Sequence, residues 1–149
     1  MIRPAETADL DTIAALRHAL WPEEPLDELR AEAEANLARG DGGFATWVAE
    51  EGGAVVGFAE VSLRRDYVNG CVSSPVAFLE GIYVLPGHRR GGAGRALVAM
   101  AEQWGRERGC RELASDALLG NELSRRFHGG AGFEETERVV YFRKLIGEP

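Results

Sequence analysis

With 149 residues, 45% of them hydrophobic, and a net charge of −7, the chain is long enough for one domain with its own core, and we expect residues 1–149 to form it. The acidic balance argues against a nucleic-acid partner, because binding to nucleic acids depends on basic side chains that neutralise phosphates. Two cysteines are too few for a disulfide framework or a zinc finger, and no apolar run reaches membrane-spanning length, so we expect a cytoplasmic protein without metal or membrane contacts.

The first half of the chain alternates between strands and acidic helices. Residues 1–60 hold 13 acidic and 4 basic side chains, so this half favours a cationic substrate. Glu51-Gly52-Gly53 is a tight hairpin signal between two apolar runs. In chain order we expect a strand over 2–4, a helix capped by Thr7 or Asp9 that stops at Trp21, an acidic helix over 26–39, and strands over 44–50 and 54–65.

The second half centres on a β-α-β unit. A loop over 66–75 precedes a mostly buried strand over 76–85, and a helix with an apolar stripe follows and ends at Gly109. A strand over 111–116 should then run parallel to the first strand, as crossover connections require. We expect a further helix over 121–130 and a final hairpin or bent strand pair over 133–146.

The glycine-rich segment between the strand and the crossover helix indicates an anion site. At a helix start the backbone N–H groups lack partners and the dipole is positive, and glycines let a pyrophosphate come close. An ATP-type phosphate loop is excluded, because it needs a lysine after its last glycine and the only lysine is Lys144. A dinucleotide fingerprint is only half matched, since Leu97 stands where its last small residue should be. The pattern Arg/Gln-x-x-Gly-x-Gly/Ala is matched in full by Arg89, Gly92 and Gly94, and this segment resembles the acetyl-coenzyme A signature of the GNAT N-acetyltransferases.

Five further segments stand out: 66–71, 73–75, 78–81, 114–116 and 132–138. Together they resemble one GNAT branch, the aminoglycoside 6'-N-acetyltransferases, and the resemblance covers nearly the whole length. The resemblance implies an α/β (α+β) GNAT fold, with a mixed, mostly antiparallel sheet and a central parallel β-α-β unit flanked by helices. It also implies transfer of acetyl from acetyl-CoA to the 6'-amine of an aminoglycoside antibiotic, which gives resistance, and a homodimer.

Glu80 is the sharpest candidate for chemistry. It shares a strand face with Phe78 and Ile82, where burial would make its carboxylate a stronger proton acceptor, as a general base requires. Gly81 beside it predicts a bulge or a close approach by another group. Asp116, at the end of the neighbouring parallel strand, could share the same cleft.

The resemblance assigns roles to further residues. Glu80 and Asp116 match acidic residues that bind the drug's amines or relay protons, and Trp21 and Tyr67 line the drug site. Backbone N–H groups of Ile82 or Val84 would pair with the pantetheine and polarise the thioester carbonyl. Asn121 would bind the cofactor arm. The expected pyrophosphate site comprises Arg89, Arg90, Gly92, Ala93, Gly94 and Arg95.

The proton donor to the departing thiolate is less clear from the sequence. Many GNAT members carry a tyrosine four residues before a Gly-Phe pair, and here Gly132-Phe133 places His128 at that position. A histidine can donate a proton near neutral pH, and Tyr141 is a competing candidate. Two alternatives stay open for the whole chain: a GNAT enzyme for another amine, such as a polyamine or a protein N-terminus, and a CoA-binding protein without turnover.

Overall fold

The computed structural model describes residues 1–148. They fall into two compact units, one from Met1 to Asp116 and one from Ala117 onward. The first unit is built on a five-stranded sheet in the order β1-β2-β3-β4-β5, with β4 and β5 parallel and the other neighbours antiparallel. The strands are β1 (Ile2–Pro4), β2 (Phe44–Glu51), β3 (Ala54–Arg64), β4 (Val76–Val84) and β5 (Leu113–Ala114).

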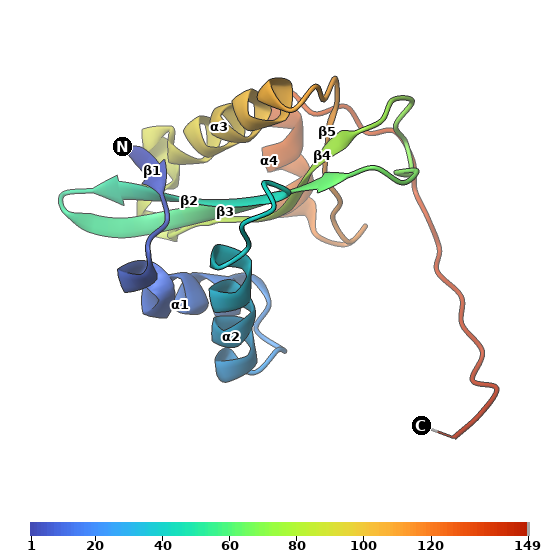
Figure 1. The fold of residues 1–149 in the computed structure, drawn as a ribbon, viewed down its shortest axis with the longest axis horizontal. Coiled ribbons are helices and arrows are strands. Elements are labelled where there is room, and N and C mark those ends of the chain that lie inside the picture. Colours follow the sequence, from blue (N-terminus) through green and yellow to red (C-terminus); the bar gives the residue numbers. More distant parts are fainter. Residues whose placement is uncertain (149) are drawn as a thin grey trace. The chain divides into compact units, whose positions relative to one another are not determined.

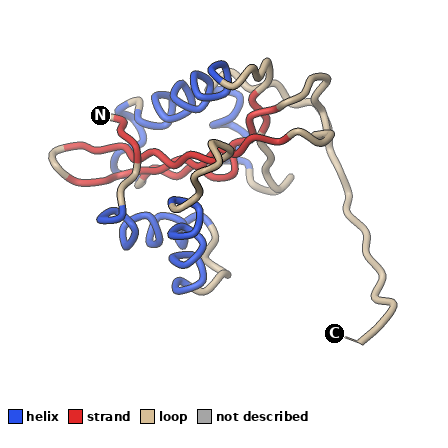
Figure 2. The backbone as a smooth tube through the Cα atoms, viewed as in Figure 1, coloured by secondary structure: helices blue, strands red, loops and turns tan. Residues whose placement is uncertain are grey.

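Helices cover both faces of this sheet. Helices α1 (Leu10–Leu20) and α2 (Leu26–Leu37) lie on one face, and α3 (Ala93–Glu107) lies on the other (Figure 1). Figure 2 shows the strands of this unit as one layer between these helices. The expected mixed α+β fold with a parallel β-α-β unit is therefore confirmed.

The core between α1 and the sheet follows from the apolar stripe of the helix. Leu10, Ile13 and Leu16 recur at helical spacing and pack against Val48 and Phe58, and all five are almost fully buried. Burying a side chain of this size stabilises the fold by about 1.5–3 kcal/mol. This packing holds α1 on the sheet. It also holds the C-terminal end of the helix beside β4.

The helix boundaries differ slightly from the expected ones. A 3-10 turn, Thr7–Asp9, precedes α1, and the Asp9 carboxylate accepts from the backbone N–H of Glu6 at 2.8 Å instead of capping the helix from its start. Helix α2 ends at Leu37, two residues before the expected end. The predicted stop of α3 at Gly109 is confirmed, because this glycine has a φ of +80°, which favours glycine, and the chain leaves the helix there.

Strands β4 and β5 separate after a very short contact. Only Ala77 with Leu113 and Phe78 with Ala114 are paired, although β4 continues to Val84. Among the described residues, the β5-facing edge of β4 therefore has no strand partner beyond Phe78. Two carbonyl oxygens of this stretch accept from side chains instead, that of Leu79 from Oγ of Ser115 at 3.4 Å and that of Val84 from Nε of Arg89 at 2.9 Å.

The second unit contains helix α4 (Glu122–Gly130). Asn121 caps it, since its Oδ1 accepts from the N–H of Ser124 at 3.1 Å, so the helix expected over 121–130 is confirmed. The expected hairpin over 133–146 is wrong: residues 133–148 contain no strand. Val140 and Phe142 favour strands by type, but a strand forms only when a second backbone completes its hydrogen bonds, and here both side chains are exposed.

No helix within residues 1–148 combines the length and the apolar composition needed to cross a membrane.

Candidate active site

A bulge in β4 places Glu80 out of line with its neighbours. Glu60 of β3 pairs with Gly81 and Val61 pairs with Leu79, so Glu80 has no partner on β3. A side chain on Gly81 would also come within 2.8 Å of Cη2 of Trp21. Both readings of this glycine, a bulge and a close approach, are therefore confirmed. The missing side chain lets the indole lie on the strand next to Glu80.

The Glu80 carboxylate has polar partners. Its Oε1 accepts a hydrogen bond from Oγ of Ser62 at 2.5 Å and from Nη2 of Arg64 at 2.8 Å, and its side chain is 32% exposed. The Arg64 guanidinium also lies 3.6 Å from the centre of the Phe78 ring, which fixes its direction. The expected apolar enclosure of Glu80 is wrong, because the bulge turns it towards these polar side chains and solvent. The result is an oriented carboxylate that solvent can reach.

Ser62 and Arg64 were not among the expected site residues. They continue the face of β3 on which the apolar Val56 and Phe58 are followed by Glu60, so polar side chains recur at every second residue towards the end of the strand. This alternation is a visible signal in the sequence. The pairing with Glu80, however, depends on the register of β3 against β4, which includes the bulge.

A cavity of about 210 Å³ opens beside Glu80, between α1, α2 and the sheet. Trp21 and Phe44 supply aromatic surface to it, and Asn36 supplies an amide. Four of its five charged lining residues are acidic, so the cavity attracts cations. These five are Arg17, Glu24, Glu32, Glu60 and Glu80.

A buried ion pair forms part of the cavity wall. Nη1 of Arg17 donates to Glu60, Nη2 lies 3.0 Å from Glu32, and Nδ2 of Asn36 donates to the second oxygen of Glu60 at 3.3 Å. Burial raises the pKa of Glu60 to about 7, against the opposing effects of Arg17 and Asn36. The sequence held a signal for this pair that was missed, since Arg17 follows Ile13 by four residues on the buried stripe of α1.

The glycine-rich segment forms the expected start of α3. A 3-10 turn, Pro86–Gly91, ends at Gly92, whose φ of +85° places it in the left-handed region before the first helical residue. Nε of Arg89 donates to the carbonyl oxygen of Val84 at 2.9 Å, and its guanidinium stacks 5.2 Å from the centre of the Tyr83 ring. Ala93 and Gly94 are buried, whereas Arg90 and Arg95 are exposed.

The end of β4 directs two backbone N–H groups away from β3. The N–H of Leu85 donates to Val56 of β3 at 2.8 Å, so the alternation of a strand turns the groups of Val84 and Ile82 to the opposite edge. The bond from Arg89 to the Val84 carbonyl agrees with this direction. These N–H groups therefore line the unpaired edge that leads into the glycine-rich turn.

Two other expected residues of the first unit lie at its surface. Tyr67 is 76% exposed in the loop between β3 and β4. Asp116 is exposed two residues beyond β5. Within this unit only Trp21 and Glu80, of the four expected drug-site residues, line the same cavity.

The expected residues of the second unit have local contacts in and after α4. The Nδ1 of His128 lies 2.7 Å from the carbonyl oxygen of Ser124, and its ring packs edgewise against Phe127 and Phe133. Tyr141 is 83% exposed. The roles of His128, Tyr141 and the capping residue Asn121 stay predictions.

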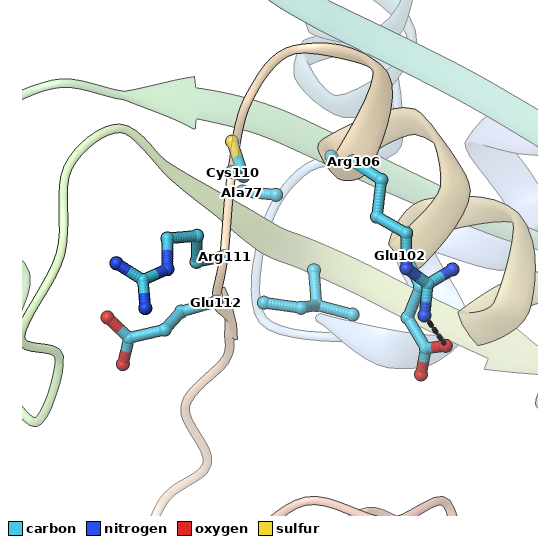
Figure 3. Close-up of a pocket in the computed structure, with 8 residues that line it drawn as sticks. Ala77, Glu102, Arg106, Cys110, Arg111 and Glu112 are labelled. Carbon is cyan, nitrogen blue, oxygen red and sulfur yellow. Dashed lines mark hydrogen bonds and ion pairs between the residues drawn. The ribbon is translucent and has the colours of Figure 1, made fainter.

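A second hollow, of about 80 Å³, lies between the end of α3 and β5 (Figure 3). Ala77, Cys110 and Glu112 help to line it, and Arg106 pairs with Glu102 at its margin. Burial raises the pKa of the Cys110 thiol, which makes it a poor nucleophile at neutral pH. This hollow contains none of the expected site residues.

Comparison with known proteins identifies the family. The family model described as "Acetyltransferase (GNAT) family" matches residues 10–133. The chain belongs to the GNAT acetyltransferase family. As a GNAT protein, it is an acetyl-CoA-dependent N-acetyltransferase.

Individual GNAT relatives match nearly the whole chain. The aminoglycoside N(6')-acetyltransferase type 1 of Serratia marcescens is 48% identical over 99% of this chain and 100% of its own. The protein of that name from Salmonella typhimurium is 46% identical over 96% of this chain and 97% of its own. The solved structure of AAC(6')-Iy in complex with the bisubstrate analogue CoA-S-monomethyl-acetylneamine has a TM-score of 0.89 and 45% identity, over 97% of each chain.

Proposed function

We propose that this enzyme transfers acetyl from acetyl-CoA to the 6'-amine of aminoglycoside antibiotics and thereby confers resistance to them. The observation that carries the proposal is the carboxylate of Glu80, held by Ser62 and Arg64 at the rim of an acidic cavity. A polycationic amine suits such a cavity, because each ammonium group is attracted electrostatically by the nearby carboxylates. The choice of substrate is supported by relatives named aminoglycoside N(6')-acetyltransferase, which are 46% and 48% identical over nearly the whole chain.

The reaction proceeds by direct transfer within a ternary complex. Glu80 takes a proton from the substrate ammonium, directly or through a water molecule, and the free amine attacks the thioester carbonyl. N–H groups of Ile82 or Val84 donate to the carbonyl oxygen and stabilise the negative charge that develops on it. The new C–N bond forms as the C–S bond breaks, the nitrogen releases its second proton to solvent, and His128 or Tyr141 gives a proton to the thiolate.

The acetyl-CoA site combines backbone N–H donors with the positive charge of arginine side chains. The left-handed Gly92 opens α3 without a side chain in the way, so backbone donors at the helix start can approach the pyrophosphate. Exposed arginines supply attraction, and Asn121 contacts the cofactor arm. The residues assigned to this site are Ile82, Val84, Arg89, Arg90, Gly92, Ala93, Gly94, Arg95 and Asn121.

The aminoglycoside site uses Trp21 and Glu80 from the cavity, together with Tyr67 and Asp116. Trp21 gives an aromatic face for a sugar ring. Glu80 and Asp116 give carboxylates for its amines, and Asp116 can also relay a proton from Glu80.

We further propose that residues 1–149 form one GNAT domain, which works in the cytoplasm as a homodimer. The family match across both compact units supports one domain. The free thiols of Cys71 and Cys110 are compatible with a reducing compartment. Exposed apolar side chains such as Phe142 and Ile146 support an interface with a second copy.

The alternative is a GNAT enzyme for another amine, because an acidic cavity suits any polyamine or peptide N-terminus. Thiol release from acetyl-CoA should be measured against aminoglycosides, polyamines and peptides, and the products should be identified by mass spectrometry. We expect the highest kcat/KM for aminoglycosides with a primary 6'-amine. Analogues with a 6'-hydroxyl should bind without turnover, since a hydroxyl is a weak nucleophile at neutral pH. A much higher kcat/KM for polyamines or peptides would overturn the aminoglycoside assignment.

A further inference from the structure

The wall of the cavity beside Glu80 contains a polar group that the proposed acetyl transfer does not use. Arg17 and Glu60 are only 2% and 1% exposed, yet both line the cavity. Nε of Arg17 is buried and has no hydrogen-bond partner within residues 1–148. A buried donor without a partner destabilises the fold, so a ligand oxygen that accepted from this nitrogen would gain binding free energy.

Other groups that line the cavity are carboxylates, which accept hydrogen bonds. The carboxylates of Glu24 and Glu32 carry negative charge at the cavity, and the side chain of Glu32 is 60% exposed although it pairs with Arg17. A group that satisfies both sides has an oxygen acceptor next to an ammonium. The cavity holds about 210 Å³, which is less than the roughly 300–1,000 Å³ of a pocket for a whole drug-sized ligand, so it suits one part of a larger molecule.

We propose that Arg17 and Glu32 are specificity-determining residues of this cavity, where they bind a hydroxyl and a neighbouring ammonium of the amino-sugar ring that carries the reacting amine. The inference rests on the proposed aminoglycoside function. Nε of Arg17 donates to the hydroxyl oxygen, and Glu32 accepts from the ammonium. Because Glu80 lines the same cavity, a ring seated there keeps its reacting amine near the general base.

Three antibiotics separate the two contacts. Kanamycin B carries a 2'-amine and a 3'-hydroxyl on this ring, tobramycin lacks the 3'-hydroxyl, and kanamycin A has a hydroxyl in place of the 2'-amine. We expect the wild-type enzyme to show a kcat/KM about tenfold lower for each analogue than for kanamycin B, the usual cost of losing a hydrogen bond to a charged group.

Enzyme variants test which residues are responsible. Glu32→Gln should lower kcat/KM for kanamycin B about tenfold, mainly through KM, and should leave kanamycin A nearly unchanged. Glu34→Gln is the matched control, because Glu34 lies on the same helix with a similarly exposed side chain, outside the cavity. Arg17→Met should remove the preference for kanamycin B over tobramycin. If it does not fold, the Glu32 pair of measurements still decides the question.

A structural role and a specificity-determining role give different patterns. A variant that only disturbs the fold lowers kcat/KM equally for all three drugs, whereas a variant of a specificity-determining residue affects only the drug that carries the matching group. Equal values for the three drugs, or an equal effect of Glu32→Gln on each, would overturn the specificity-determining role and leave the acetyltransferase assignment intact. Turnover of polyamines with no aminoglycoside turnover would overturn both.

Discussion

The indole of Trp21 occupies the space that a side chain on Gly81 would fill, since Cη2 lies 2.8 Å from the position of that absent Cβ. Trp21 comes from the end of α1, and Gly81 follows the bulge residue of β4. The Arg17 guanidinium lies 5.0 Å from the centre of the same indole, so the ring is held from two sides. One glycine thus determines how the end of α1 lies on the strand that carries Glu80.

Replacing this glycine tests the contact. Gly81→Ala should displace the indole, lower the free energy of unfolding by about 1–3 kcal/mol, and raise the aminoglycoside KM roughly tenfold while the acetyl-CoA KM changes little. Thermal unfolding and initial-rate kinetics measure both effects. In a Trp21→Ala background the added methyl meets no ring, so its cost should shrink. An equal cost in both backgrounds would mean that the contact is not responsible.

The role of Glu80 as a base is tested by Glu80→Gln. The amide keeps the size of the side chain and can still accept from Ser62, but it cannot take a proton from the substrate. We expect kcat to fall roughly 10²-fold with little change in the acetyl-CoA KM. If Asp116 shares the task the loss is smaller, and Asp116→Asn in addition should complete it. Identical rate profiles against pH for Glu80→Gln and wild type would rule out the role.

The helix start at Gly92 should control the affinity for the cofactor. Gly92→Ala forces a Cβ into the left-handed region at a cost of about 1–2 kcal/mol, which corresponds to roughly a tenfold rise in the acetyl-CoA Kd if the turn relaxes. Gly87→Ala is the control, because Gly87 is in the same turn, has no positive φ and has open space at its Cβ position. Calorimetric titration with CoA should separate the two variants; equal affinities would contradict the assignment.

His128 and Tyr141 are separated as proton donors by kinetics. A thiol with a pKa of about 8.5 is already a fair leaving group, so loss of its acid should cost less than loss of the base. If His128 is the donor, His128→Ala lowers kcat and removes the high-pH limb of its profile, while Tyr141→Phe has no effect. The opposite result would assign the proton to Tyr141.

The stability of the enzyme should depend on pH through Glu60. Its pKa is about 7 in the folded protein and near 4.5 when exposed, so the folded state binds more protons between these values. The free energy of unfolding should therefore fall as pH rises from about 4.5 to 7, by on the order of 3 kcal/mol at most. Denaturant titrations should show a flatter dependence for Glu60→Gln, whereas Glu34→Gln should follow the wild type. A Glu60→Gln curve parallel to the wild-type curve would contradict this origin.

The local signals in the sequence were sufficient for most of the fold. The stripe of α3, its stop at Gly109 and the Glu51-Gly52-Gly53 hairpin each depend on a few neighbouring residues, and each is present in the structure. The prediction of a final hairpin was wrong because it could not rest on local signals alone. Residues 133–146 have strand-forming side chains, but the formation of a strand depends on a partner backbone that no local pattern specifies.

The candidate site shows the same division. Gly81 indicated both the bulge and a close neighbour, because a glycine within a strand commonly marks one or the other. The partners of Glu80 could not be derived, since Ser62 and Arg64 reach it only through the register across the bulge. The Arg17–Glu60 pair joins a helix and a strand 43 residues apart. The sequence shows this contact only as one charged residue within each of two apolar patterns.

The edge of β4 without a strand partner has a consequence for drug design. In the proposed complex the pantetheine is held by main-chain N–H groups of Ile82 and Val84, and every residue except proline supplies the same group. Point mutations that exchange these side chains therefore leave the anchoring atoms in place. An inhibitor that mimics the thioester arm along this edge would meet few routes of escape, whereas one built only for the acidic cavity would face variable side chains.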